Sequence, residues 1–127
     1  MTLERKTIGA WGEEIAANYL RSRKYRIVAQ NYRQPWGEID LIAEHEGVVV
    51  FCEVKTNSRD LGGGFAPELR VNSKKSRHIL RTAKIFFNKY YKGQAKEWRV
   101  DIISVILNRI LDQATVRHFK NVLIDTN

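Results

Sequence analysis

Acidic residues and a lysine are concentrated in the segment GEIDLIAEHEGVVVFCEVK, which runs from Gly37 to Lys55. Twelve residues separate Asp40 from Glu53, and Lys55 follows Glu53 by two positions. Carboxylate oxygens are the ligands that Mg²⁺ prefers. A lysine beside such a metal can orient a water molecule or offset the charge that develops on a phosphate. These residue types at this spacing are therefore candidates for metal-assisted chemistry on a phosphate.

Two strands joined by a tight turn must position these residues. The pattern predicts strands at 38–43 and 48–55, with Glu46-Gly47 as a two-residue turn in which glycine supplies a positive φ. This register sets Asp40 directly opposite Glu53. The other opposing pairs that matter are His45 with Val48 and Glu38 with Lys55.

Side-chain alternation divides this hairpin into a polar and an apolar face. Glu38, Asp40, Glu53 and Lys55 share the polar face. Carboxylates directly opposite one another in a sheet repel, and a divalent cation between them turns the repulsion into ligation. The alternative is a solvated face on which Lys55 only screens the acids. The apolar face is predicted to comprise Ile39, Leu41, Ala43, Val48, Val50, Cys52 and Val54.

The rest of the chain predicts a single domain, residues 1–127, of the α/β class with a mixed sheet and the element order α-β-β-β-α-β-β. Asn57–Asn72 is predicted to be a loop that adapts to substrate through Gly62-Gly63-Gly64. The other predicted elements are a helix at Thr7–Arg23 with Thr7 as its N-cap, a strand at Tyr25–Tyr32, a helix at Ser73–Tyr91, and strands at Trp98–Leu107 and Ala114–Phe119.

The positive charge of the chain is concentrated in one element. The sequence has 22 basic and 14 acidic residues, a formal net charge of +8. Ten of the basic residues and one acid lie between Arg70 and Arg99, so this window carries +9 and the remainder carries −1. A concentrated basic element favours a polyanionic partner such as nucleic acid.

The predicted helix in this window has two faces. An apolar stripe consists of Ile79, Leu80, Ala83, Phe86, Phe87 and Tyr90. Cations recur at three- and four-residue spacing on the other side, and no acid between Lys74 and Tyr91 pairs with them. This pattern favours contact with a phosphate backbone over an ordinary solvated face. The predicted nucleic-acid-binding residues are Lys74, Lys75, Arg77, Arg81 and Lys84.

Membrane and secreted classes are disfavoured by the sequence. It contains no apolar run of the roughly 20 residues that a membrane span requires, and its N-terminus lacks an apolar stretch of the signal-peptide type. The single cysteine, Cys52, cannot form an internal disulfide, which suits a reducing compartment. We therefore expect a cytoplasmic protein without a membrane partner.

Six short motifs together resemble the YraN family, which is similar to archaeal Holliday-junction resolvases within the restriction-endonuclease-like, PD-(D/E)xK, superfamily. The resemblance runs from about Ile8 to Leu123. Its most specific part is GEIDLI at Gly37–Ile42, followed by Glu53-Val54-Lys55. The other motifs are Gly9-x-x-Gly12-Glu13-x-x-Ala16, Asn31-Tyr32-Arg33, Phe51-Cys52, Arg99-Val100-Asp101, and His118 with Asn121.

The resemblance implies a restriction-endonuclease-like core and a DNA endonuclease that uses Mg²⁺ or Mn²⁺ on branched or structured DNA. Glu13, Asp40 and Glu53 match the metal-binding acids, and Lys55 matches the catalytic lysine. Glu38 belongs to the signature and either joins the metal shell or pairs with Lys55. Resolvase-like nucleases often act as homodimers, so the resemblance also implies a second copy as a partner.

The chain departs from the family pattern at two positions. Asn57 stands where the family commonly has a basic residue, which implies one weaker phosphate contact. Ile39 precedes Asp40 where the superfamily name has proline, a substitution that is usual in this family.

Two alternatives to the nuclease hypothesis stay open at this level. The chain could be a non-catalytic nucleic-acid-binding accessory protein in recombination, repair or uptake, or a scaffold whose basic helix docks an acidic protein. Asp101 and His118 also have two interpretations, as structural residues or as metal ligands, and a lone Asp in an apolar strand favours the structural one.

Overall fold

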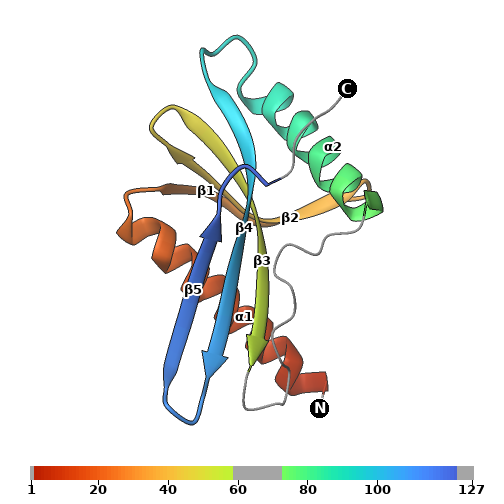
Figure 1. The fold of residues 1–127 in the computed structure, drawn as a ribbon. Coiled ribbons are helices and arrows are strands. Elements are labelled where there is room, and N and C mark those ends of the chain that lie inside the picture. Colours follow the sequence, from red (N-terminus) through yellow and green to blue (C-terminus); the bar gives the residue numbers. More distant parts are fainter. Residues whose placement is uncertain (1, 59–72, 123–127) are drawn as a thin grey trace.

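The computed structural model describes residues 2–58 and 73–122, and describes side chains from Thr7 and Lys74 onward in these two segments. The predicted element order α-β-β-β-α-β-β is confirmed (Figure 1). No helix in the described segments is long and apolar enough to cross a membrane. In chain order the elements are α1 (Thr2–Ser22), β1 (Arg26–Gln34), β2 (Gly37–His45), β3 (Val48–Ser58), α2 (Ser73–Tyr90), β4 (Glu97–Asn108) and β5 (Gln113–Phe119).

The strands form one mixed sheet in the order β1-β2-β3-β4-β5. The pairs β1–β2, β2–β3 and β4–β5 are antiparallel, and the pair β3–β4 is parallel. Helix α2 lies between β3 and β4 in the chain. Parallel neighbours require such a crossover. The turn between β2 and β3 is the predicted one, because Glu46 and Gly47 both have positive φ and His45 pairs with Val48.

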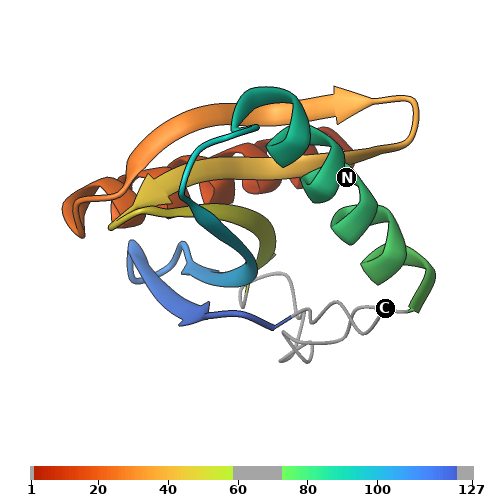
Figure 2. The same ribbon diagram turned by 90° about the horizontal axis from the view of Figure 1, so that it is seen from above.

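The two helices pack against different faces of the sheet. Alternate residues of β3 separate accordingly: Val50 and Cys52 belong to the core around α1, and Val49 and Phe51 belong to the core around α2. Figure 1 shows α1 running diagonally along the sheet, and Figure 2 shows α2 beside the β1–β2 hairpin. The predicted alternation of the central hairpin is therefore confirmed for most of its length.

Ile39 is an exception to the predicted apolar face. It lies in the α2 core together with Ile42, three residues further on, and not with Leu41 in the α1 core. Pairing between β2 and β3 ends at Leu41, so the beginning of β2 is bonded to β1 alone. Two-stranded ribbons twist more strongly than wide sheets, which accounts for the change of face.

Three smaller expectations were wrong. The first helix begins at Thr2, so Thr7 lies inside it and is not its N-cap. Asn57 and Ser58 belong to β3, because the parallel pairing with β4 continues through them. Tyr90 is 51% exposed and does not continue the buried stripe of α2. The sequence analysis did not include Thr82 in the core; it is buried, and its hydroxyl donates to the carbonyl of His78 in its own helix. The glycines at 62–64 lie outside the described residues.

Glycines allow both helices to approach the sheet closely. A Cβ at Gly12 in α1 would lie 1.9 Å from Oγ1 of Thr56 in β3, and a Cβ at Gly37 in β2 would lie 2.3 Å from Oγ1 of Thr82 in α2. A larger residue at Gly12 therefore requires either the Thr56 side chain or α1 to shift. This contact fixes the height and rotation of the helix that carries Glu13.

We expect Gly12→Ala to lower the free energy of unfolding by about 1–3 kcal/mol, because the added methyl group overpacks the contact with Thr56. Gly9→Ala is the matched control, since nothing lies within 4 Å of a Cβ at Gly9. It should be neutral or stabilise by up to about 1 kcal/mol through helix propensity. Urea unfolding followed by circular dichroism measures both, and equal effects would contradict the close contact.

Candidate functional site

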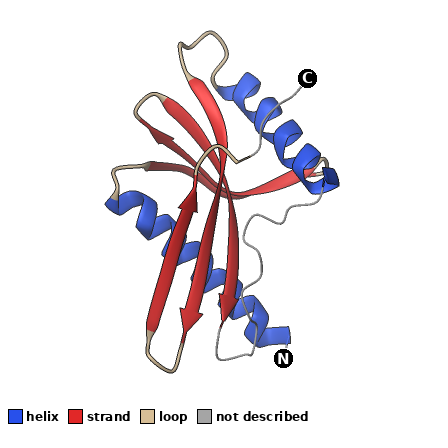
Figure 3. Ribbon diagram, in the orientation of Figure 1, coloured by secondary structure: helices blue, strands red, loops and turns tan. Residues whose placement is uncertain are grey.

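The central sheet forks at the carboxylates. Registered pairs between β2 and β3 run from His45–Val48 to Leu41–Cys52, and the next residues along each strand are Asp40 and Glu53. Beyond this point β2 continues beside β1, and β3 continues beside β4. Figure 3 shows the two strands diverging, with the start of β2 directed toward α2.

The predicted backbone pairs Asp40–Glu53 and Glu38–Lys55 are therefore wrong, although the register that leads to them is correct. Glu38 pairs with Arg33 of β1, and Lys55 pairs with Ser104 of β4. The amide of Val54 donates instead to Oδ2 of Asp40 over 2.8 Å. The carboxylate of Asp40 thus accepts the hydrogen bond of a β3 amide at the point where the β2–β3 ladder ends.

Asp40 is the electrostatic centre of the fork. Burial raises the pKa of Asp40, and the negative charges of Glu53, Glu13 and Glu38 raise it further, to about 7. The hydrogen bond from Val54 opposes this change and only partly offsets it. Asp40 is therefore surrounded by carboxylates that come from α1, β2 and β3.

Glu53 is the most deeply buried of these acids, with 8% of its surface exposed. Its Oε1 lies 2.5 Å from Nζ of Lys75 on α2. Burial alone would lower the pKa of Lys75, but the hydrogen bond to Glu53 and the charges of Asp40 and Glu38 raise it above its ordinary value. The lysine is therefore a cation within the acidic site.

Glu13 and Glu38 act electrostatically on Asp40, and Lys55 lies in the same strand as Glu53. Glu13 is half-buried on α1, beside the tight contact of Gly12, whereas Glu14 is exposed. Lys55 is half-buried on β3, two positions after Glu53. Glu38 is on the rim, with 67% of its side chain exposed, and its Oε2 lies 3.7 Å from Nε of Arg33.

The donor chemistry of the fork suits a hard divalent cation, because it consists of carboxylate oxygens that repel one another. In the described part of the chain, no three His, Cys, Asp or Glu side chains are already gathered as a metal site. Two of the predicted ligands have an oxygen in another contact: Oε1 of Glu53 with Lys75, and Oδ2 of Asp40 with Val54. A metal ion at the fork would therefore use the other oxygen of Asp40, and at Glu53 it would compete with the ammonium of Lys75.

The basic residues of α2 lie in two different locations: most form an exposed row, and one contacts the carboxylate site. Lys74, Arg77 and Arg81 are exposed, and Lys84 continues their row as a half-buried residue. Lys75 instead points to Glu53. The spacing offered a signal for this, since Lys75 is four residues before the buried Ile79 and therefore lies on the sheet-facing side of the helix.

Asp101 is fully buried and belongs to a separate hydrogen-bonded network. Nε of Arg99 donates to both of its oxygens at 3.0 and 3.2 Å, and the amide of Asn121 donates to Oδ1 at 2.8 Å. Nε2 of His118 lies 2.7 Å from Oδ2, and Tyr25 accepts a further bond from Arg99. Burial alone would raise the pKa of Asp101, but these hydrogen bonds lower it. The structural interpretation of Asp101 and His118 fits this network.

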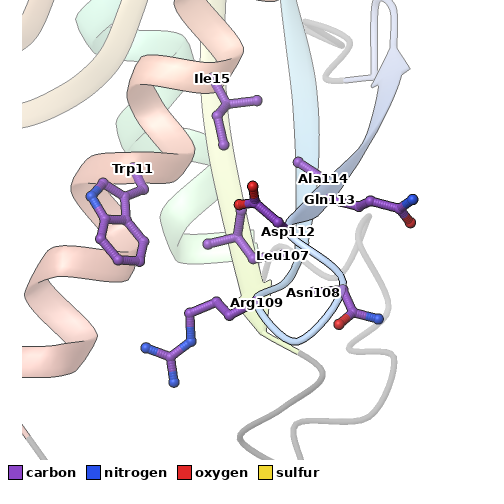
Figure 4. Close-up of a pocket in the computed structure, with 8 residues that line it drawn as sticks. All are labelled: Trp11, Ile15, Leu107, Asn108, Arg109, Asp112, Gln113 and Ala114. Carbon is purple, nitrogen blue, oxygen red and sulfur yellow. The ribbon is translucent and has the colours of Figure 1, made fainter.

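A separate pocket of about 440 Å³ lies between α1 and the β4–β5 turn (Figure 4). Trp11 and Ile15 contribute one wall from α1, and Leu107 contributes to the other from β4. Successive helical residues are rotated by about 100°, so Glu13 projects from nearly the opposite side of α1. The pocket is consequently distinct from the fork. Its other lining residues are Asn108, Arg109, Asp112, Gln113 and Ala114.

The sequence model described as "Uncharacterised protein family UPF0102" matches residues 12–105. A UPF0102 protein of Syntrophotalea carbinolica is 40% identical over 119 residues, which span 94% of this chain and 93% of the relative. The chain belongs to the UPF0102 family. Further UPF0102 relatives are found in Persephonella marina, 41% identical over 89% of this chain and 90% of the relative, and in Roseiflexus castenholzii, 33% identical over 93% and 94%. The UPF0102 match includes Glu13, Asp40, Glu53 and Lys55.

The charge of Asp40 should make the stability of this UPF0102 protein depend on pH. The pKa of Asp40 is about 7 in the folded state against an ordinary value of 3.8, so the folded state binds this proton more tightly between these values. The contribution of Asp40 to stability is therefore present below pH 4 and is lost as the pH rises to about 7. Relative to the wild type, Asp40→Asn should gain on the order of 2 kcal/mol between pH 4 and pH 8, the partial exposure of the site reducing the full effect. Urea unfolding across this range tests it, and parallel pH profiles would contradict it.

Neutralising Asp101 should lower stability, whereas neutralising Asp40 should raise it. Asp101→Asn leaves the guanidinium of Arg99 without its carboxylate partner in a buried site, so we expect a loss of about 3 kcal/mol at pH 7. Asp112→Asn, at an exposed position in the β4–β5 turn, is the control and should change stability by less than about 0.5 kcal/mol. Thermal unfolding of both variants measures this difference. A loss below about 1 kcal/mol for Asp101→Asn would show that the network adds little stability.

Proposed function

We propose that this protein is a metal-dependent endonuclease that hydrolyses phosphodiesters in branched or structured DNA. The observation that carries the proposal is the fork, where carboxylates from α1, β2 and β3 crowd around Asp40 and raise its pKa to about 7. A fold without use for a cation gains nothing from this repulsion. The resemblance to resolvase-like nucleases of the restriction-endonuclease-like superfamily supplies the reaction class and the branched substrate.

The residues of the fork fit Mg²⁺ or Mn²⁺ by their donor chemistry. Asp40 and Glu53 would hold the ion, with Glu13 completing or supporting the set. When bound, such an ion stabilises the negative charge that develops on a phosphate and makes water more acidic. Because Asp40 must be ionised to act as a ligand, metal affinity should rise between pH 6 and pH 8.

Lys55 and the basic row of α2 have different tasks in this proposal. Lys55 orients the attacking water or offsets the charge on the phosphate, as expected of an ammonium two positions after the ligand Glu53. Lys74, Arg77, Arg81 and Lys84 span about 15 Å along the helix, which equals the rise of about four nucleotides in one strand of duplex DNA. The row therefore holds the backbone while the fork acts on one phosphate.

One observation favours the alternative of a non-catalytic DNA-binding protein. Glu53, a required ligand in the nuclease proposal, already has its Oε1 in contact with Lys75. If this contact is permanent, the basic row still binds DNA but the fork holds no metal. Calorimetric titration with Mg²⁺ separates the two functions, because salt-sensitive DNA binding without metal binding supports only the alternative.

Cleavage of a panel of linear, flapped and four-way DNA substrates, with and without Mg²⁺, tests the proposed activity. We expect Mg²⁺-dependent cleavage that Asp40→Asn and Lys55→Met reduce on the order of 100-fold or more, because each removes a group at the reacting phosphate. Glu14→Gln, an exposed acid on the same helix as Glu13, is the matched control and should retain activity. Wild-type rates for Asp40→Asn would show that the assigned site is wrong.

The basic row predicts a separate effect on DNA affinity. Arg77→Gln with Arg81→Gln should weaken binding uniformly across sequences and reduce the salt dependence of log K by about 2, because each arginine neutralises one phosphate. Fluorescence anisotropy at several salt concentrations measures this slope. An unchanged slope would place the DNA on another surface.

A further inference from the structure

We propose that Lys75 is an internal cation that occupies the carboxylate site until a DNA phosphate draws it away, so that substrate binding and metal binding are coupled through this one residue. The inference rests on the proposed metal-dependent function and adds a residue to it. Sequence reasoning placed Lys75 with the DNA-contacting row, and the structure instead puts its ammonium against Glu53.

The contact between Lys75 and Glu53 joins a buried group to a half-exposed one. The Glu53 side chain is 10% exposed, whereas the Lys75 side chain is 49% exposed. The lysine therefore reaches from the edge of α2 into the site, and its withdrawal requires a change of its rotamers. The Glu53 side chain has less freedom to move, because it is shorter and almost entirely buried.

A divalent cation and the ammonium group compete for the same carboxylate. Oε1 of Glu53 lies 2.5 Å from Nζ of Lys75, so a metal ion bound to that oxygen would lie against the positive charge of the ammonium. Asp40 and Glu38 also attract the ammonium, as their effect on the pKa of Lys75 indicates. With Lys75 in place the repulsion among the acids is partly relieved, so the affinity of the site for metal is reduced.

The place of Lys75 on α2 supplies the means of release. The exposed Lys74 precedes it, and the exposed Arg77 follows two positions later. A phosphate backbone bound along this row brings new anionic oxygens to the start of α2, where a flexible, half-exposed lysine can reach them. DNA thus offers Lys75 another partner and frees Glu53 for metal.

Coupling of this kind is reciprocal. If DNA raises the metal affinity by some factor, metal must raise the DNA affinity by the same factor. Removal of the ammonium should abolish the coupling and leave the metal site open without DNA. We expect Lys75→Met to bind Mn²⁺ about 10-fold more tightly than the wild type when DNA is absent, within the usual 5- to 150-fold range of coupling between sites.

The test measures Mn²⁺ binding by isothermal titration calorimetry on the full chain at pH 8. Lys74→Met is the matched control, since it removes a neighbouring exposed cation and should weaken DNA binding without changing Mn²⁺ affinity. Lys75→Arg keeps a cation at the site and should remain close to the wild type. Thermal unfolding confirms that each variant is folded. The arms with a short DNA duplex use the Lys55→Met background, so that the duplex is not cleaved during the titration.

In these arms DNA should raise the Mn²⁺ affinity of the Lys55→Met protein about 10-fold and leave that of the Lys55→Met, Lys75→Met protein unchanged. Equal or weaker Mn²⁺ binding by Lys75→Met without DNA overturns the role of Lys75. If the wild type still cleaves DNA with metal in that case, the proposed function stands. Absence of Mn²⁺ binding in every variant, together with absence of cleavage, overturns both.

Discussion

The hydrogen bond from the amide of Val54 to the carboxylate of Asp40 is the interaction on which the site depends. In this bond a carboxylate, and not a backbone carbonyl, accepts from an amide of β3 where pairing with β2 ends. The two strands separate there, at the acids. A continuous ladder would extend the flat hairpin and place the acids on an ordinary sheet face. The fork instead leaves Asp40 partly buried beside Glu53, where the charges of Glu13 and Glu38 also act on it. A local exchange of one hydrogen-bond acceptor thus produces the concentration of negative charge.

Both helices contribute to this fork because glycines let them approach the strands. Gly12 allows α1 to lie directly on Thr56, which brings Glu13 toward Asp40, and Gly37 allows α2 to lie close to the start of β2. From the other face of the sheet α2 supplies a cation, Lys75, to Glu53.

Two buried acids of the protein, Asp101 and Asp40, have opposite pKa shifts. Asp101 has three hydrogen-bonding partners and a lowered pKa, whereas Asp40 has neighbouring acids and a raised one. Burial alone does not explain this difference, since Asp101 is fully buried.

Much of the fold follows from patterns that act over short distances in the sequence. The Glu46-Gly47 turn and the apolar alternation fix the register of the central hairpin, and this prediction is confirmed as far as Leu41 and Cys52. The fork itself could not be predicted from alternation, because it depends on a side chain competing for a backbone amide. Lys75 was assigned to the DNA-contacting row because charge in sequence does not reveal a partner on a distant strand. Its spacing to the buried Ile79 carried the only local signal.

We propose that carboxylates at the fork repel one another until a divalent cation joins them. A ¹³C nuclear magnetic resonance titration of the Asp40 carboxyl group, with and without Mg²⁺, tests it most directly. Without metal, burial and the neighbouring acids should hold the pKa of Asp40 at about 7, and saturating Mg²⁺ should shift the titration to clearly lower pH. A pKa near the ordinary value of Asp that Mg²⁺ leaves unchanged would contradict the account.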